Sequence, residues 1–510
     1  MRKLIGRYMV IHVRRLVYFF LVLSVQQNVS AATLEQTQLL APDVSVLSQR
    51  TERRLGDRIV RDLYRDPDYL DDPVISDYLQ AIWQPLMASA RSRSEITSEL
   101  DAAFAWQLLQ GRDRTVNAFA LPGGYFGVHL GLIGIVSSRD ELASVLAHEL
   151  SHVTQRHIAR LMSKQSEQAP WLVGAMILGA LAASKNPGGA NAVIVGGQAA
   201  AAQSQLNFSR DMEREADRTG FGVASDAGFS PQGFVSMFEK LQQSNRNNDS
   251  GNFPYLRSHP LTTERIADMK SRIPEGASTA PTGTLEHAMV SARARLLSNS
   301  SVEALRNWYS ETEPGLLAKS TSSQKVASLY GATLAAIKLR DFSRALAYSN
   351  SLQTLVATDA PAKRQSRYLR AELFMAEGKP DAALSTLEFN AAPKTRADLL
   401  LWMPLKVATG QADVADAAAQ LWLIDNPTDA SMWQQLASAR ASQGRMVAAV
   451  RAEAEVNIAY FDYAAAVSRL KAAQLLYRSS PQNADHIEAS IVDVRLRQVE
   501  QLLREQAVER

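Results

Sequence analysis

Residues 146–153 read LAHELSHV and contain the pattern His-Glu-x-x-His, formed by His148, Glu149 and His152. Apolar residues at positions 142, 145, 146, 150 and 153 follow the spacing of one helical face, and Ser138 with Glu141 predicts a capping box where this helix begins. Two histidines four residues apart project from the same side of a helix, one turn apart. That separation lets two imidazoles bind one zinc ion, while Glu149 is placed to take a proton from a water molecule beside the metal.

A second set of ionisable residues lies at positions 209–217, which read SRDMEREAD. Glu213 and Asp217 are four residues apart and therefore share one helical face. Glu213 would supply a third zinc ligand and leave a fourth position for water, and Asp217 would hold a ligand imidazole by its other ring nitrogen. The acidic residues alternate with arginines, so the pattern is equally typical of a solvated, charged helix.

The His-Glu-x-x-His motif and the pattern Glu213-x-x-Ala216-Asp217 together resemble the metallopeptidase family of the heat-shock protease HtpX and the CAAX prenyl proteases, over residues 55–273. The resemblance implies that Glu213, and not Glu215, is the third ligand of one Zn²⁺ per chain. It implies catalytic roles for Glu149 and Asp217, and an α+β zincin-type domain with a small sheet. Membrane-embedded members have transmembrane helices beside the site; this sequence shows none clearly and resembles the exported branch.

His259 lies in the later stretch SHP, residues 258–260, which the resemblance also covers. One hypothesis is that His259 occupies the fourth position on zinc in a resting state, displaces the catalytic water and keeps the protease latent. The alternative is a structural histidine that orients its loop. His129, His157, His287 and His486 show no partner pattern, and we interpret them as structural.

Three short strands are expected before the zinc helix, at residues 104–109, 116–121 and 125–130, with a break at 122–124. Metalloproteases commonly hold a substrate as an added strand on an exposed sheet edge. Asn117, Ala118 and Phe119 form the candidate edge; alternatively, the strands only support the zinc helix. Asp72 followed by Pro73 predicts the start of an earlier helix, and residues 243–251 are polar and predicted to be a loop.

The first 31 residues read as a secretory signal peptide. They contain five of the basic residues and no acidic one, so the remainder of the chain has a net charge of −2, compared with +3 for the whole. An apolar stretch of ten residues, 16–25, precedes a cleavage site between Ala31 and Ala32. An uncleaved anchor is the alternative, although ten apolar residues are too few to cross a bilayer. The absence of cysteine excludes disulfides and a lipid-modified N-terminal cysteine, and an exported chain with neither points to the periplasm. The charge gives no indication of nucleic-acid binding.

Residues 170–203 are rich in alanine and glycine and nearly uncharged. We interpret them first as a buried helix with a loop that forms a lid over the zinc cleft. The alternative is a patch that makes peripheral contact with a membrane. The apolar run within this segment is too short to cross a bilayer as a straight helix.

After a linker at residues 274–284, the sequence is helical to residue 510. Gly378, Gly410 and Gly444 lie between pairs of helical patterns, spaced by 32 and 34 residues, and a weaker copy turns at residues 340–342. This resembles tetratricopeptide repeats, which have a period of 34; an irregular helical bundle is the alternative. The predicted fold is therefore mainly α: a metalloprotease domain at residues 32–273, followed by a helical repeat solenoid at 285–510.

Both modules behind an export signal resemble periplasmic proteases that assist the assembly of outer-membrane β-barrel proteins. The resemblance implies a zinc endopeptidase, with chaperone activity as a second role. Its substrates would be unfolded or stalled outer-membrane proteins, and its repeats would contact the assembly machinery. The competing hypothesis is a non-proteolytic chaperone or scaffold that acts through its repeats and has a latent zinc site.

Overall fold

The computed structural model describes residues 47–165, 209–247, 253–273, 275, 283–387, 393–479 and 485–508. The expected signal peptide, the candidate lid at 170–203 and most of the expected linker lie outside these residues. The chain divides into the units Met1–Leu47 and Ser48–Arg510, and every element below belongs to the second unit.

A four-stranded sheet has the order β1-β2-β4-β3. Its strands are β1 (Tyr69–Leu70), β2 (Gln107–Gly111), β3 (Ala118–Leu121) and β4 (Tyr125–His129). β2 and β4 are parallel, and the other pairs are antiparallel. The β3–β4 connection is tight because Gly123 and Gly124 adopt positive φ angles of 75° and 80°. β3 therefore lies at one edge of the sheet.

The strand predicted at residues 104–109 begins later and ends at Gly111, so its predicted bounds were wrong. Trp106 has a φ of 50°, which is incompatible with an extended strand. Its indole donates a hydrogen bond to the carbonyl of Asp101, and its own carbonyl accepts one from the indole of Trp83. These contacts fix residues 104–106 as a bent connection.

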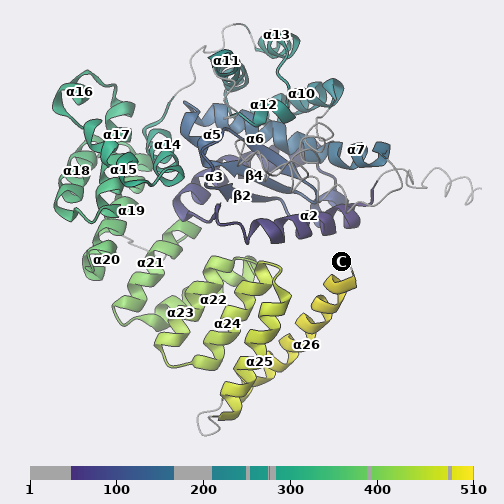
Figure 1. The fold of residues 1–510 in the computed structure, drawn as a ribbon, viewed down its shortest axis with the longest axis vertical. Coiled ribbons are helices and arrows are strands. Elements are labelled where there is room, and N and C mark those ends of the chain that lie inside the picture. Colours follow the sequence, from purple (N-terminus) through teal and green to yellow (C-terminus); the bar gives the residue numbers. More distant parts are fainter. Residues whose placement is uncertain are drawn as a thin grey trace, which may run out of the picture. The chain divides into compact units, whose positions relative to one another are not determined.

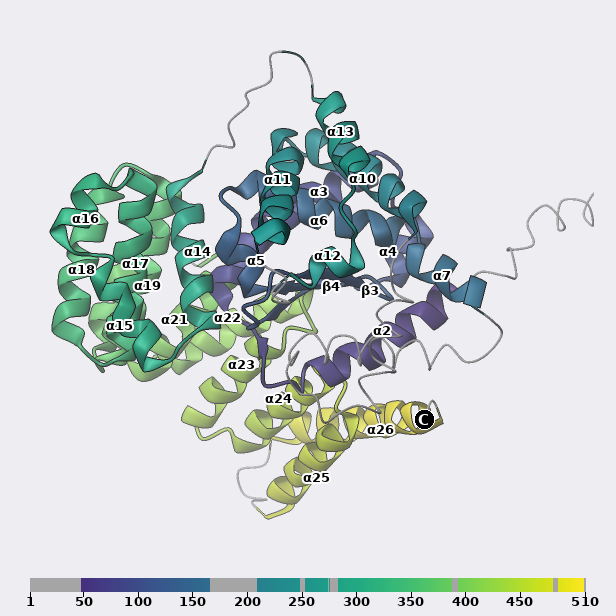
Figure 2. The ribbon, with the colours of Figure 1, turned by 45° about the horizontal axis from the view of Figure 1, so that its top comes forward.

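Helices enclose the sheet. α3 (Pro73–Ser92), α6 (Arg139–Thr154) and α10 (Arg210–Asp226) lie on one side of the strands, and α2 (Gln49–Leu63) lies on the other (Figures 1 and 2). Asp72 caps α3 with its side chain, as predicted. The remaining helices of this part are α4 (Ser98–Ala103), α5 (Leu130–Ile135), α7 (His157–Gln165), α11 (Gln232–Asn247), α12 (Tyr255–Ser258) and α13 (Thr263–Arg272). The loop predicted at 243–251 is wrong for its first five residues, because polar residues without glycine or proline let α11 continue.

α6 is the predicted zinc helix, and it is more deeply buried than an amphipathic helix would be. Every residue from position 141 to 153 is buried, including its charged and polar ones. The hydroxyl of Ser138 accepts from the amide of Glu141, as expected, but the Glu141 carboxylate accepts from Ser137 and also pairs with Lys240. The capping box is therefore incomplete: the Glu141 side chain bonds the amide of Ser137 and not that of Ser138, the N-cap residue.

The C-terminal part is entirely helical in the residues described there (Figure 1), in agreement with the mainly α fold predicted. Gly378, Gly410 and Gly444 each connect two helices with φ angles of 75–79°, and Arg340 with a φ of 59° makes the corresponding turn earlier. The helices are α14 (Leu285–Ser298), α15 (Val302–Ser310), α16 (Pro314–Lys319), α17 (Ser322–Lys338), α18 (Phe342–Leu355), α19 (Ala360–Ala376), α20 (Pro380–Leu387), α21 (Arg396–Ala408), α22 (Ala412–Asp425), α23 (Ala430–Ser442), α24 (Met446–Ala459), α25 (Tyr463–Ser479) and α26 (His486–Val508). Among the described residues, we find no helix with the length and apolarity that a bilayer crossing requires.

α14 connects the sheet-containing part to the helical part. Val290 and Ala294 belong to the core that surrounds α6, whereas Met289 and Leu296 on the same helix belong to the next core. Buried Arg293 extends from α14 to the carboxylates of Asp72 and Glu372, at 2.7 Å from each. The two predicted modules therefore share a helix and a buried ion-pair cluster.

Gly220 determines how closely α10 approaches α6. A Cβ at this position would lie 3.0 Å from the backbone of Ala147 and 3.1 Å from the amide nitrogen of His148. Backbone atoms cannot rotate aside, so a larger residue requires the two helices to separate.

We predict that Gly220→Ala lowers stability and weakens metal binding. Overpacking costs about 1–3 kcal/mol and exceeds the gain of about 1 kcal/mol in helix propensity. The midpoint of thermal unfolding of metal-free protein and the zinc dissociation constant would measure the two effects. The control is Gly315→Ala in α16, where no atom lies within 4 Å of the added Cβ. Equal unfolding midpoints and equal zinc dissociation constants for the two variants would contradict the role of Gly220 in the packing of α10 against α6.

Candidate metal centre

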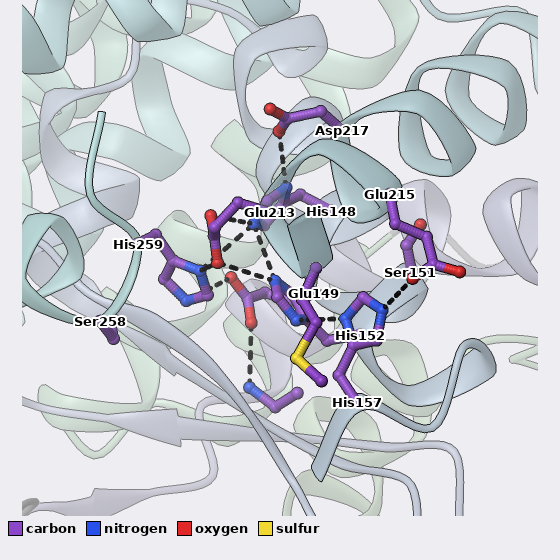
Figure 3. Close-up of polar contacts among 12 residues, drawn as sticks. His148, Glu149, Ser151, His152, His157, Glu213, Glu215, Asp217, Ser258 and His259 are labelled. Atoms are coloured by element: carbon purple, nitrogen blue, oxygen red, sulfur yellow. Dashed lines mark hydrogen bonds and ion pairs between the residues drawn. The ribbon is translucent and has the colours of Figure 1, made fainter. Parts of the chain in front are cut away.

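Four side chains from three places in the chain converge in the interior. His148 and His152 come from α6, Glu213 comes from α10, and His259 directly follows α12 (Figure 3). One donor atom from each lies within 4.8 Å of the others, and none of the four residues is more than 2% exposed. The structure thus brings together the three predicted ligands and the proposed fourth one.

The spacing of these donor atoms fits a tetrahedral zinc ion. Nε2 of His148 is 3.0 Å from Nε2 of His152 and 3.6 Å from Oε2 of Glu213. Nδ1 of His259 lies 3.3 Å from Nε2 of His148 and 3.0 Å from Oε1 of Glu213. Ligand atoms at 2.0–2.1 Å from a tetrahedral zinc are about 3.3 Å apart. Three imidazoles and one carboxylate are, in addition, a donor set that zinc prefers.

Asp217 contacts the ring nitrogen of His148 that faces away from the cluster. Its Oδ1 lies 3.0 Å from Nδ1 of His148. Arg265 donates to both oxygens of Asp217, at 2.6 and 2.8 Å, and lies 2.7 Å from Oε2 of Glu213. Burial alone would raise the pKa of Asp217, but the bonds from Arg265 and His148 outweigh it and lower the pKa to about 2. An ionised Asp217 places the ring proton of His148 on Nδ1 and leaves Nε2 free for a metal.

Sequence reasoning missed Arg265. This residue is only 4% exposed although it lies in the first turn of α13, and it neutralises two buried carboxylates. Its only sequence signal is its position six residues after His259, in the segment that the family resemblance covers. Without the structure, an arginine in a charged helix gives no reason to expect burial.

His157, which shows no partner pattern in the sequence, contacts two other ionisable residues, and its interpretation as a structural residue stays a prediction. Nδ1 of His157 lies 2.9 Å from Nδ1 of His152, and Nε2 lies 3.0 Å from Oε2 of Glu215. Burial lowers the pKa of His157 to about 4, even though Glu215 acts in the opposite direction. The other three histidines lie outside the cluster: His129 bonds Thr115, His287 bonds Tyr78, and His486 bonds Tyr477.

Glu149 lies between the cluster and the sheet. Its Oε2 accepts a hydrogen bond of 3.0 Å from the amide of Ala120, and its Oε1 is 3.4 Å from Nε2 of His259. Burial raises the pKa of Glu149, and the neighbouring His259 and His148 oppose that rise. A buried carboxyl with a raised pKa is suited to accept and return a proton.

β3 supplies the edge that reaches this site. Phe119 pairs with Gly127 and Leu121 pairs with Tyr125 on β4, and the Asn117 carbonyl accepts from His129. Main-chain groups alternate in direction along a strand, so those of Ala118 and Ala120 point away from β4. β3 therefore reaches the cluster at Ala120, which follows the three predicted edge residues and lies next to Glu149. Of those three, Asn117 and Ala118 are buried.

We predict that Arg265→Met destabilises the metal-free protein strongly, because it leaves Asp217 and Glu213 buried without their cation. Removing one partner of a buried ion pair costs about 3–5 kcal/mol. Thermal unfolding in the presence of a chelator measures the effect. The control is Arg272→Met in the same helix, whose half-exposed pair with Asp268 contributes about 0–1 kcal/mol. Similar unfolding midpoints for the two variants would rule out the neutralising role.

Comparison with known proteins agrees with this geometry. The profile described as Peptidase family M48 matches residues 77–273. The chain is 30% identical to the "Beta-barrel assembly-enhancing protease" of Yersinia pestis, over 82% of this chain and 84% of the relative. It is 29% identical to the protein of the same name in Escherichia coli (strain K12), over 90% of each.

A further relative matches a smaller share of the chain. The "Mitochondrial metalloendopeptidase OMA1" of Saccharomyces cerevisiae is 28% identical over 39% of this chain and 56% of its own length. The bacterial relatives match more than four-fifths of this chain, so their matches include residues of both the sheet-containing and the helical part. The chain is a member of peptidase family M48, in the group of the β-barrel assembly-enhancing proteases.

Proposed function

We propose that the protein is a zinc-dependent endopeptidase with one Zn²⁺ held by His148, His152 and Glu213. The observation that carries this proposal is the convergence of these three side chains in a buried cluster whose donor spacing suits zinc. When bound, zinc would act as a Lewis acid that polarises the scissile carbonyl and makes a neighbouring water molecule more acidic. The amino-acid residues around it perform the remaining steps.

Glu149 would be the general base, because its buried carboxylate lies beside the cluster, 3.4 Å from Nε2 of His259, and burial raises its pKa. It takes the proton of the attacking water and passes it to the leaving amine. Asp217 acts through His148: it keeps the ring in the tautomer that binds metal. Arg265 pairs with Glu213 and Asp217 and fixes both carboxylates in place.

β3 would bind the substrate as an additional strand along Asn117, Ala118 and Phe119. Support comes from the position of β3 at the sheet edge and from the outward direction of the Ala118 and Ala120 main-chain groups. Hydrogen bonds to a main chain do not depend on side-chain identity. An extended segment of any unfolded protein would therefore suit this edge, and a folded protein would not.

His259 would keep the enzyme latent. Its Nδ1 is among the four converging donor atoms, and its Nε2 lies 3.4 Å from Glu149. One imidazole therefore reaches both the fourth ligand position and the general base. Cleavage would require His259 to withdraw, so that water can enter and Glu149 is released.

In the cell, we propose that the protein is exported to the periplasm by a signal peptide at residues 1–31. There it would promote the assembly of outer-membrane β-barrel proteins and degrade those that stall. The names of the bacterial relatives, which match over 82–90% of this chain, support this role. We further propose that residues 285–510 are tetratricopeptide repeats that contact the assembly machinery, and that chaperone activity accompanies proteolysis.

The presence of His259 in the cluster favours a second candidate, a non-proteolytic scaffold with a permanently capped site.

We predict that Glu149→Gln retains zinc and loses proteolysis. An amide cannot accept the proton, and loss of general-base catalysis lowers rates by about 10²–10⁴-fold. Zinc content of the purified protein and degradation of casein, an unfolded substrate, measure the two properties. Glu303→Gln, an exposed position on α15, is the control. Cleavage by the Glu149 variant at the wild-type rate would remove Glu149 from its role, whereas absence of zinc from the wild type would refute the metal site.

We predict that His259→Ala accelerates casein cleavage while zinc remains bound through three ligands. If nine-tenths of the molecules are capped at rest, the rate rises by about 10-fold. Circular dichroism and thermal unfolding establish that the variant is folded, and His259→Asn provides a second replacement. Unchanged or lower activity in folded variants would exclude latency through His259. Inactivity of wild type and variants alike would favour the scaffold.

A further inference from the structure

We propose that His157 and Glu215 form a positioning relay for His152, which fixes the tautomer and the ring orientation of that ligand. The inference rests on the metal site proposed above and deepens it. It assigns a role to His157 and Glu215, which are not metal ligands in either of the two sequence motifs. The relay runs from Glu215 on α10 through His157 on α7 to His152 on α6 (Figure 3).

The direction of each hydrogen bond in this relay follows from the geometry. Nε2 of His152 faces the other donor atoms, so it must present a lone pair to a metal, and the ring proton must be on Nδ1. Nδ1 of His152 then donates to Nδ1 of His157, 2.9 Å away. His157 must accept there, so its own proton is on Nε2 and is donated to Glu215 at 3.0 Å.

Glu215 selects this direction over the reverse one. Oε2 of Glu215 also receives Nη1 of Arg160 at 2.9 Å, and a carboxylate paired with a guanidinium acts only as an acceptor. If the relay were reversed, His157 would need a proton from Glu215, and His152 would have its proton on Nε2. That tautomer of His152 cannot bind a metal. Glu215 thus excludes the tautomer of His152 that cannot bind the metal, although Glu215 contacts His152 only through His157.

The backbone between α6 and α7 directs His157 back toward the cluster. Arg156 ends the turn with a left-handed φ of 54°, and its guanidinium is fastened to buried Glu52 of α2. α7 begins at the next residue, with the side chain of His157 fully buried. A buried ring with partners on both nitrogens cannot rotate freely, so it holds His152 in one orientation.

α10 therefore supports the two histidines of the motif in two different ways. Asp217 contacts Nδ1 of His148 directly, and Glu215 reaches Nδ1 of His152 through an intervening imidazole. Glu215 and Asp217 lie two and four positions after Glu213 on the same helix. The functional demand is the same in both cases: an acceptor at Nδ1, so that Nε2 is available.

The test compares replacements of His157 that remove or retain an acceptor at the position of Nδ1. Zinc dissociation constants of the purified full chain are measured by competition with a chromogenic chelator. His157→Phe should weaken zinc binding by about 10–100-fold. His157→Asn, whose Oδ1 can occupy the place of Nδ1, should restore most of the affinity. Glu215→Gln, at a partly exposed position, should weaken binding to an intermediate extent because an amide permits both directions.

The matched control is His287→Phe, a buried histidine bonded to Tyr78 and the carbonyl of Val136, outside the cluster. It should lower thermal stability and leave the zinc dissociation constant unchanged. Wild-type affinity in His157→Phe, or equal losses in His157→Asn and His157→Phe, would overturn the relay. If His157→Phe does not fold, His157→Asn and Glu215→Gln decide: the relay requires near-normal zinc affinity in the former and a loss in the latter. Failure of the wild type to bind zinc would instead refute the metal site itself.

Discussion

The burial of His148, Glu149 and His152 within α6 is the constraint on which the rest of the protease part depends. A polar or ionisable group in the interior is costly unless it has a partner. Here, the partners must come from other elements, because the neighbours of these residues within α6 are apolar or small. α10 supplies three carboxylates, α13 supplies one arginine, α7 supplies one histidine, and β3 supplies an amide. Each of these elements is therefore held against α6 by packing and by the need to satisfy a specific buried group.

This dependence accounts for the tight helix packing around α6. Gly220 permits α10 to approach to backbone contact, and only such an approach places Glu213 and Asp217 near the imidazoles. Arg265 offsets the resulting concentration of negative charge. Farther away, Arg293 performs a similar role between α3, α14 and α19, where it joins Asp72 to Glu372. Buried arginines thus neutralise carboxylates both at the site and where the sheet-containing and helical parts meet.

Much of the architecture could be predicted from local patterns. The capped helix around His148, the edge position of β3 and the glycine turns at 378, 410 and 444 depend on residues close together in sequence. The partners of the site could not be predicted in this way. Arg265 lies 48 residues from Asp217, and His157 meets Glu215 across 58 residues, so neither pair leaves a periodic signal. Trp106 is a further example, since its left-handed conformation is accompanied by hydrogen bonds with Asp101 and Trp83 that strand propensity does not reflect.

The hydrogen bond from Ala120 to Glu149 has a consequence for the timing of the proposed catalysis. The amide of Ala120 points away from β4, and in the absence of a substrate that amide is already engaged by the carboxylate of Glu149. An incoming peptide that extends the sheet at this point competes with Glu149 for the same N–H. If the peptide accepts this hydrogen bond, the carboxylate of Glu149 loses its contact with Ala120 when the substrate binds. Under the proposed mechanism, occupation of the edge would thus remove one of the two contacts that hold Glu149, and withdrawal of His259 would remove the other.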